Sequence, residues 1–164
     1  MSTLQGMRGF LAVLAFFLLG GCYSFTGSGL PSHLRTVKIE QVQDKARQTE
    51  LADVATSKVV AGFRSRGSLK PVDGAADSRL EATLVDYTHK ASQWDGTGTV
   101  TRFSVTITFS ARFTDEKESA ILFESNSIAG TQDYDPNKET EQDAAKKALD
   151  EAVKRLVDNT ISGW

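Results

Sequence analysis

The sequence predicts an α+β domain, a two-layer sandwich in which two helices pack on one face of a mostly antiparallel four-stranded sheet. Three observations predict it. One segment alternates apolar and polar residues over more than a dozen positions, two others place apolar residues three or four positions apart, and turns containing Gly and Asp separate the strand-like segments. Alternation is typical of a strand with one buried face, and the wider spacing is typical of an amphipathic helix. In chain order these segments predict β-α-β-β-β-α.

The first two elements are a strand and a helix. Residues 34–42 alternate and predict the first strand. Residues 50–66 predict a helix, with Thr49 as its N-cap and Gly67 at its end. The apolar or small residues that predict one buried face of this helix are Leu51, Val54, Ala55, Val59, Gly62 and Phe63.

Three strands and a second helix follow. Residues 79–89 are strand-like, and the turn after them contains Asp95, Gly96 and Gly98, which suit a hairpin. Residues 99–113 form the clearest strand. Its odd positions are apolar (Phe103, Val105, Ile107, Phe109, Ala111 and Phe113), and its even positions are polar (Arg102, Ser104, Thr106, Thr108, Ser110 and Arg112).

The last strand and helix complete the predicted domain. After a turn at 115–119, residues 120–131 predict the fourth strand, and residues 138–161 predict a closing helix. Its apolar face contains Ala145, Ala148, Leu149, Ala152, Val153, Leu156 and Thr160.

Composition excludes several classes of protein. The chain has 164 residues and 19 Lys and Arg against 21 Asp and Glu, so it has no basic field and we expect no nucleic-acid partner. A single Cys cannot form an intramolecular disulfide, and one Cys with two His makes a weak case for structural zinc. We therefore expect no metal site and no cofactor.

The N-terminus predicts an export signal. Residues 10–19 are ten consecutive apolar residues, whereas a bilayer-spanning helix needs about 20 and the apolar part of a signal peptide has about 7–15. The start is Met1 or Met7, since Met7 directly precedes Arg8 and would leave a compact basic segment. Residues 1–21 are the predicted signal peptide.

The signal ends in Leu19-Gly20-Gly21-Cys22, which resembles the lipobox of bacterial lipoproteins. In such lipoproteins, small residues let the chain enter the lipoprotein signal peptidase, and the thiol of the Cys carries diacylglycerol. The resemblance therefore implies that Cys22 carries diacylglycerol and, with an N-acyl chain added, anchors the protein stably in a membrane. The alternative is that Cys22 is an ordinary buried cysteine. Tyr23 stands where Asp would suggest inner-membrane retention, which favours the outer membrane by analogy. Residues 22–33, rich in Gly and Ser, are the predicted tether, and residues 34–164 are the domain.

A catalytic set is not evident. His33 falls in the predicted tether, and His89 follows a strand with no neighbour in the sequence to orient it. Asp115, Glu116 and Glu118 bunch in a turn, and a solvated hairpin tip explains them better than a calcium loop. We therefore expect no catalytic residues and no enzyme activity.

Basic residues and one Trp are the remaining candidates. Arg64, Arg66 and Lys70 cluster after the first helix, and Lys90, Arg102 and Arg112 border the central hairpin. They are ordinary surface charges or contacts to phosphorylated lipid through charge-assisted hydrogen bonds. Trp94, at the hairpin tip, is either a contact anchor or a residue that folds back onto the sheet.

Most of the predicted mature chain resembles the LptE-type lipopolysaccharide-assembly lipoproteins. The order and spacing of several segments carry the resemblance: G-C-Y-S-F at the acylation site, L-P-S-H-L-R-T-V-K-I, L-E-A-T-L-V-D-Y, G-T-V-T-R-F-S-V-T-I-T-F, L-F-E-S, and a closing helix that ends in G-W. The resemblance implies a lipid-anchored, periplasm-facing outer-membrane protein. It would plug and help assemble the barrel of an LptD-type translocon and contact lipopolysaccharide.

The resemblance also implies a lipid-contact site. In the family, basic residues at the central hairpin tip and just before the last helix are associated with lipopolysaccharide. Lys138 matches the second position, whereas the tip here reads Trp94-Asp95-Gly96, so Lys90 and Arg102 are the substitutes to consider. A different class stays open: an envelope lipoprotein that binds another small ligand or a periplasmic protein, which the fold alone does not exclude.

Overall fold

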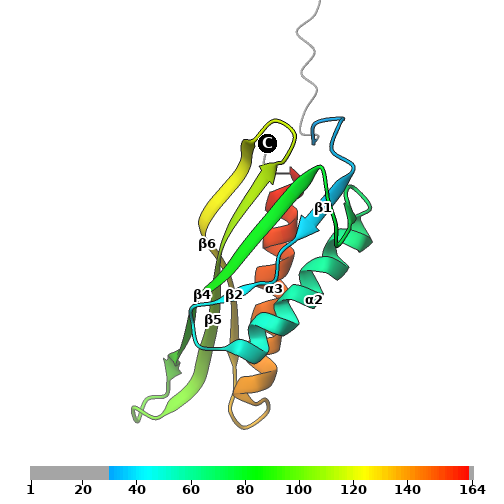
Figure 1. Ribbon diagram of the computed structural model, residues 1–164. Coiled ribbons are helices and arrows are strands. Elements are labelled where there is room, and N and C mark those ends of the chain that lie inside the picture. The colour runs from blue at the N-terminus through cyan, green and yellow to red at the C-terminus, as the bar shows by residue number, and fades with distance from the viewer. Residues whose placement is uncertain (1–29, 163–164) are drawn as a thin grey trace, which may run out of the picture.

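The computed structural model of the chain describes residues 30–162. The predicted signal peptide, Cys22 and most of the predicted tether lie outside these residues. Along the chain, the elements are β1 (Thr36–Ile39), β2 (Gln43–Asp44), α2 (Thr49–Arg66), β3 (Lys70–Pro71), β4 (Ser78–Trp94), β5 (Val100–Asp115), β6 (Ala120–Tyr134) and α3 (Glu141–Ser162). Both helices cover the same face of the sheet (Figure 1), as predicted. Among residues 30–162, no helix combines the length and the apolarity that a bilayer-spanning segment requires.

The sheet is mixed and has six strands, so the prediction of four mostly antiparallel strands is wrong. The main order is β3-β1-β4-β5-β6, and β2 also pairs with β4. β1 runs parallel to β3 and β4, and β2 runs parallel to β4, whereas the long strands β4, β5 and β6 are antiparallel. The parallel pairings follow from α2, because the helix carries the chain from the end of the first strands back to their start, where β3 begins.

The predicted first strand is split in two. β1 ends at Ile39 and β2 begins at Gln43. Between them, the backbone N–H of Val42 donates to the Thr56 hydroxyl of α2 at 3.0 Å instead of to a neighbouring strand. At this break, the helix therefore supplies the hydrogen-bond acceptor for a backbone N–H that no strand pairs with, and the Val42 side chain is buried in the core.

One predicted end of α2 is confirmed and the other is wrong. The helix ends at Gly67, which adopts φ 69° while its N–H bonds to the Phe63 carbonyl. This left-handed conformation favours glycine. At the start, the N-cap is Gln48, without a side-chain capping bond. Thr49 instead donates its hydroxyl to Asp44 at 3.1 Å.

The alternation in β5 has its predicted consequence. Val105, Ile107, Phe109 and Phe113 are fully buried beneath the helices. Most of the polar residues between them lie on the face without helices and keep partial exposure. Because the same pattern continues across β4, the sheet has one core face and one polar face.

Helix α3 lies unusually close to β6. A Cβ built on Gly130 would lie 2.1 Å from the Ala148 carbonyl oxygen and 2.4 Å from the Ala152 nitrogen. Both alanines are fully buried. The small residues on both sides let the two backbones approach, and this contact fixes α3 relative to the strand that precedes it.

The domain is elongated and has two distinct ends (Figure 1). The 17 residues of β4 span roughly 55 Å at about 3.3 Å per residue. The tether end comprises residues 30–35, the β5–β6 turn and the C-terminal ends of both helices. The hairpin end comprises the β4–β5 turn and the β6–α3 loop.

Candidate functional site

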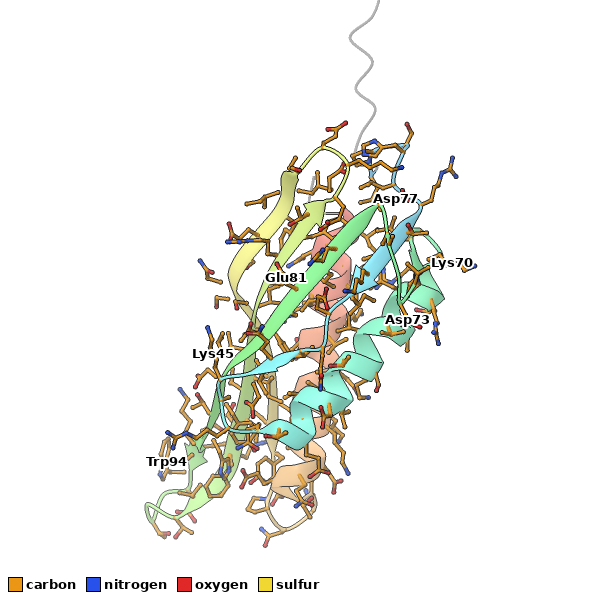
Figure 2. All side chains as sticks on the ribbon, viewed as in Figure 1. Lys45, Lys70, Asp73, Asp77, Glu81 and Trp94 are labelled. Atoms are coloured by element: carbon orange, nitrogen blue, oxygen red, sulfur yellow. The ribbon has the colours of Figure 1, made fainter. Side chains whose placement is uncertain are left out.

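A hollow of about 540 Å³ lies at the hairpin end, and we call it the hairpin groove. Its walls come from the β4–β5 hairpin, the end of β6 and the loop before α3. The lining residues are Gln93, Trp94, Asp95, Thr101, Arg102, Gln132, Asp133, Tyr134, Asp135, Lys138 and Glu139. Figure 2 shows Trp94 at this end of the sheet.

Strand register brings three of the predicted contact residues into this groove. Trp94 is the last residue of β4, and Arg102, on β5, pairs with Gln93. Phe103 pairs with Tyr134 at the end of β6, so the loop carrying Lys138 follows directly beside the hairpin. Lys90 is exposed but pairs with Ser104, further from the tip, and is not among the lining residues.

One of the two interpretations of Trp94, that it folds back onto the sheet, is wrong. Its side chain is 55% exposed and borders the groove, so it does not fold back onto the sheet. The turn beyond it is held by Asp95, whose carboxylate accepts the backbone N–H of Thr97 at 2.8 Å and of Thr99 at 3.0 Å. Hydrogen bonds from the Thr97 hydroxyl and from these N–H groups lower the pKa of Asp95.

The opposite wall is a turn organised by Asp135. Its carboxylate accepts the backbone N–H of Asn137 at 2.9 Å, and its carbonyl accepts the backbone N–H of Lys138 at 2.9 Å. The N–H of Asn137 is the main group that lowers the pKa of Asp135. Lys138 extends its ammonium to 3.4 Å from the same carboxylate and is 82% exposed, so it is accessible to a ligand.

The charges in the groove are mixed. Arg102 and Lys138 are accompanied by four carboxylates, Asp95, Asp133, Asp135 and Glu139. Asp95 and Asp135 serve their turns, and Glu139 lies 2.9 Å from Lys147. Arg102 has no ion-pair partner within residues 30–162. The two cations can bind a phosphate, the exposed indole can pack against a sugar ring, and the carboxylates can accept hydrogen bonds from sugar hydroxyl groups. This combination suits a phosphorylated sugar better than a simple polyanion.

His89 is held in a network beside the groove, which corrects the expectation that nothing orients it. Its Nε2 lies 2.9 Å from the Tyr134 hydroxyl, and its Nδ1 lies 3.2 Å from Glu141. Tyr87 also donates to Glu141, at 2.7 Å. The rings of His89, Phe103 and Tyr134 pack against one another, with centroids 5.0 to 5.9 Å apart. Burial raises the pKa of Tyr134, so its hydroxyl stays protonated and is a poor base. The network therefore joins the start of α3 to the sheet and supports the groove wall.

Asp115 is not part of a solvated tip, contrary to the prediction. It is fully buried and accepts the backbone N–H groups of Lys117 and Glu118 at 2.8 and 3.0 Å. Its second oxygen lies 2.5 Å from Nε2 of His33. Burial opposes ionisation, but the bonds from Glu118, His33 and Lys117 together lower the pKa of Asp115. His33, Asp115 and Glu118 each place one atom of a type that can bind a metal within 4.8 Å of the other two. The direct hydrogen bond between His33 and Asp115 explains why the closest pair of these atoms is so close.

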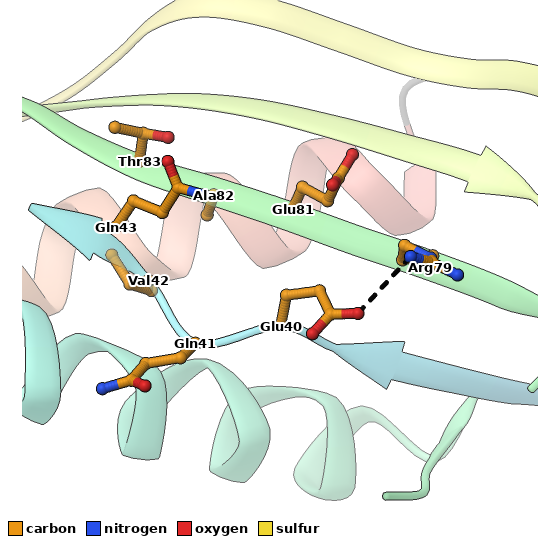
Figure 3. Close-up of a pocket in the computed structure, with 8 residues that line it drawn as sticks. All are labelled: Glu40, Gln41, Val42, Gln43, Arg79, Glu81, Ala82 and Thr83. Atoms are coloured by element: carbon orange, nitrogen blue, oxygen red, sulfur yellow. Dashed lines mark ion pairs between the residues drawn. The ribbon is translucent and has the colours of Figure 1, made fainter. Parts of the chain in front are cut away.

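A second hollow, of about 480 Å³, lies between the β1–β2 segment and β4 (Figure 3). Its cation, Arg79, is 3.6 Å from Glu40 and 2.8 Å from Glu116. Arg112 was expected to border the hairpin, but it pairs with Glu124 at 2.7 Å, at the other end of β5. Arg79 and Arg112 are both paired with acids, whereas Arg102 of the hairpin groove has no such partner among the described residues, so the hairpin groove is the stronger candidate for a phosphorylated ligand.

Sequence reasoning missed part of the groove wall. The predicted fourth strand ended at Thr131, so Asp133, Tyr134 and the turn at Asp135 were not considered. The available signal was Tyr134, an aromatic residue that falls on the same face of the strand as Ile128 and Gly130 and is buried with them at the true end of β6.

Solved structures with the same fold include two bacterial lipoproteins. The uncharacterized lipoprotein B from Nitrosomonas europaea is 16% identical, with a TM-score of 0.59 over 80% of this chain and 84% of that one. A minor lipoprotein from Acinetobacter baumannii is 10% identical, with a TM-score of 0.51 over 79% of this chain and 92% of that one. These likenesses establish the fold.

Comparison with curated protein sequences finds no match. The sequence model of one family, described as LptE: Lipopolysaccharide-assembly, matches residues 34–160. This match covers every strand and nearly all of both helices of the described domain, including both walls of the hairpin groove. The chain therefore belongs to the LptE family of lipopolysaccharide-assembly proteins.

Proposed function

We propose that this protein is a non-enzymatic lipoprotein of the outer membrane, anchored through acylated Cys22 and facing the periplasm, that plugs and helps assemble an LptD-type barrel. Its membership of the lipopolysaccharide-assembly family supports this role. The lipobox at residues 19–22 supports the anchor. No residue of the chain is assigned a catalytic role.

We further propose that the hairpin groove contacts the phosphorylated sugar part of lipopolysaccharide. The observation that carries this proposal is that Trp94, Arg102 and Lys138, from three separate segments, line one hollow. Arg102 and Lys138 would bind phosphate oxygens through charge-assisted hydrogen bonds. Trp94 would pack its ring against the apolar face of a sugar, and carboxylates such as Asp133 would accept sugar hydroxyl groups.

The groove also offers a replacement for the basic residue that the family pattern places at the hairpin tip and that this chain lacks. The tip of the hairpin holds Trp94-Asp95-Gly96 and lacks the basic residue. Arg102 projects from β5 into the same groove as Lys138. A cation is thus supplied by the adjacent strand, and the indole adds a surface that a basic side chain does not provide.

The polar face of the sheet supports the barrel partnership. Thr106, Thr108 and Ser110 of β5 lie on the face without helices. The two ion pairs Arg79–Glu116 and Arg112–Glu124 neutralise charge at the ends of this face nearest the tether. A surface of hydroxyls and paired charges suits the polar interior of a membrane barrel.

The lipopolysaccharide contact is tested by direct binding of the purified protein to lipopolysaccharide. Arg102→Gln and Lys138→Gln should each weaken binding about tenfold, because one charge-assisted hydrogen bond contributes about 1.5–3 kcal/mol. Lys146→Gln is the matched control, since Lys146 is an exposed lysine of α3 outside the groove. Unchanged binding by both groove variants, or equal loss in the control, would remove the groove from the proposal.

The partnership and the anchor need separate experiments. A tagged protein purified from solubilised envelopes should bring with it a large, heat-modifiable barrel. Recovery of a monomer in mild detergent would instead favour an envelope lipoprotein that binds another small ligand or a periplasmic protein. Intact-mass measurement should show lipid on Cys22, and Cys22→Ser should abolish membrane association.

A further inference from the structure

We propose that the tether end carries a membrane-facing surface, formed by Arg35, Arg64 and Lys70, that contacts the head groups of anionic phospholipids. This inference rests on the proposed acylation of Cys22. It concerns the opposite end of the domain from the hairpin groove, and it assigns a role to part of the basic cluster that follows α2.

The fold gathers these three cations at one place. Arg35 directly precedes β1, and Lys70 opens β3 beside it, with the Lys70 backbone N–H donating to the Arg35 carbonyl at 2.9 Å. Arg64 lies in the last turn of α2, just before the chain turns at Gly67 toward β3. Figure 2 shows Lys70 beside this end of the helix. All three side chains are exposed.

Neighbouring cations are neutralised, whereas these three are not. Arg66 pairs with Asp158, and Lys117 pairs with Asp77. Within residues 30–162, Arg35, Arg64 and Lys70 form no ion pair. A basic residue at the end of a helix is favoured by the helix dipole, which accounts for Arg64. Arg35 and Lys70 belong to the strand side of this end, so the dipole does not explain them.

The path of the chain brings this surface to the bilayer. Leu30 packs against the core and His33 is bonded to Asp115, so the chain enters the domain next to Arg35. Cys22 precedes Leu30 by eight residues, which span at most about 29 Å when extended. Attraction to an anionic surface acts within a Debye length of about 8 Å at physiological salt. A tether of at most about 29 Å therefore lets the three cations come within this distance of the head groups, and each of them adds to the attraction.

The test uses the acylated protein reconstituted into vesicles. Acylation consumes the single natural thiol, so Ser68→Cys introduces a unique labelling site on this surface, at an exposed residue between α2 and β3. A fluorophore on this site is read against a quencher attached to lipid head groups. The vesicles are phosphatidylcholine alone or phosphatidylcholine with phosphatidylglycerol.

Quenching should be at least about twofold stronger in the anionic vesicles and should fall at high salt. The combined variant Arg35→Gln, Arg64→Gln, Lys70→Gln should reduce it to the phosphatidylcholine value. The control carries the same change of charge away from the tether end, as Lys45→Gln, Arg47→Gln, Lys146→Gln, and should quench like the unsubstituted protein.

Equal quenching in both kinds of vesicle, or unchanged quenching in the combined variant, would overturn the proposal while leaving the anchor and the barrel partnership intact. An unmodified Cys22 by intact mass, together with loss of all vesicle association, would overturn the acylation and this inference with it. Co-purification of the barrel reports on the partnership independently of either result.

Discussion

Replacing Gly130 with Ala tests whether the close contact of α3 with β6 holds the domain together. The added Cβ would lie 2.1 Å from the Ala148 carbonyl oxygen and 2.4 Å from the Ala152 nitrogen. Both obstacles are backbone atoms of one helix, so no rotamer change relieves them, and α3 must move by about an ångström or more. Overpacking a core costs about 1–3 kcal/mol, and we expect Gly130→Ala to reach or exceed the upper limit.

Urea unfolding followed by circular dichroism measures this change as a fall in the free energy of unfolding. Gly74→Ala is the matched control, because a Cβ there meets no atom within 4 Å and restricting the unfolded chain adds about 0.4–1 kcal/mol of stability. Gly62→Ala is intermediate, since its new methyl would meet only the Val157 side chain, at 2.9 Å. A Gly130→Ala protein within about 0.5 kcal/mol of the unsubstituted one would refute the argument that this contact positions α3.

Three further substitutions probe the core, the acid stability and the groove. Phe63→Ala, at a fully buried position, should lower the free energy of unfolding by about 3–5 kcal/mol in the same assay. Asp77, which accepts bonds from Lys117 and from the start of β1, has a pKa well below its usual value. The contribution of the ionised Asp77 to stability is present above about pH 4 and is lost as the pH falls toward the pKa of the folded state. Asp77→Asn should therefore flatten the decline in melting temperature between about pH 4 and pH 2. An equally steep decline in the variant would contradict this. Asp133→Asn should strengthen binding of inorganic polyphosphate to the groove but not binding of lipopolysaccharide, and a parallel gain for both ligands would argue against a role in accepting sugar hydroxyls.

The parts of the fold that sequence reasoning predicted are those with a long local pattern. β5 alternates from Phe103 to Phe113, and its apolar positions from Val105 onward are buried as predicted. Gly67 ends α2 because a left-handed residue is needed there. In contrast, β2 and β3 have two residues each. Two residues cannot display a period, and these strands exist only because β1 and β4 offer them a parallel edge to pair with.

The candidate site was also predictable only where nearby sequence was enough, and not where it depends on residues far apart in the chain. Trp94, Arg102 and Lys138 could each be selected from the sequence, by exposure, alternation and resemblance. Their convergence could not, since it depends on Phe103 pairing with Tyr134, 31 residues later. The network around His89 was missed for a similar reason, because its bonding partner Tyr134 is 45 residues away in the chain.

The charge of the groove determines how it can recognise a ligand. The whole chain has a formal charge of −2, and the groove holds two cations among four carboxylates. Such a site generates little long-range attraction for anions, so it does not concentrate polyanions by steering. Under the function proposed for it, its affinity comes from short contacts that a matching ligand completes together: a phosphate between Arg102 and Lys138, and a sugar ring on Trp94. Binding should therefore depend only weakly on salt and strongly on the sugar, whereas at the tether end three unpaired cations make contact with a charged surface strongly salt-dependent.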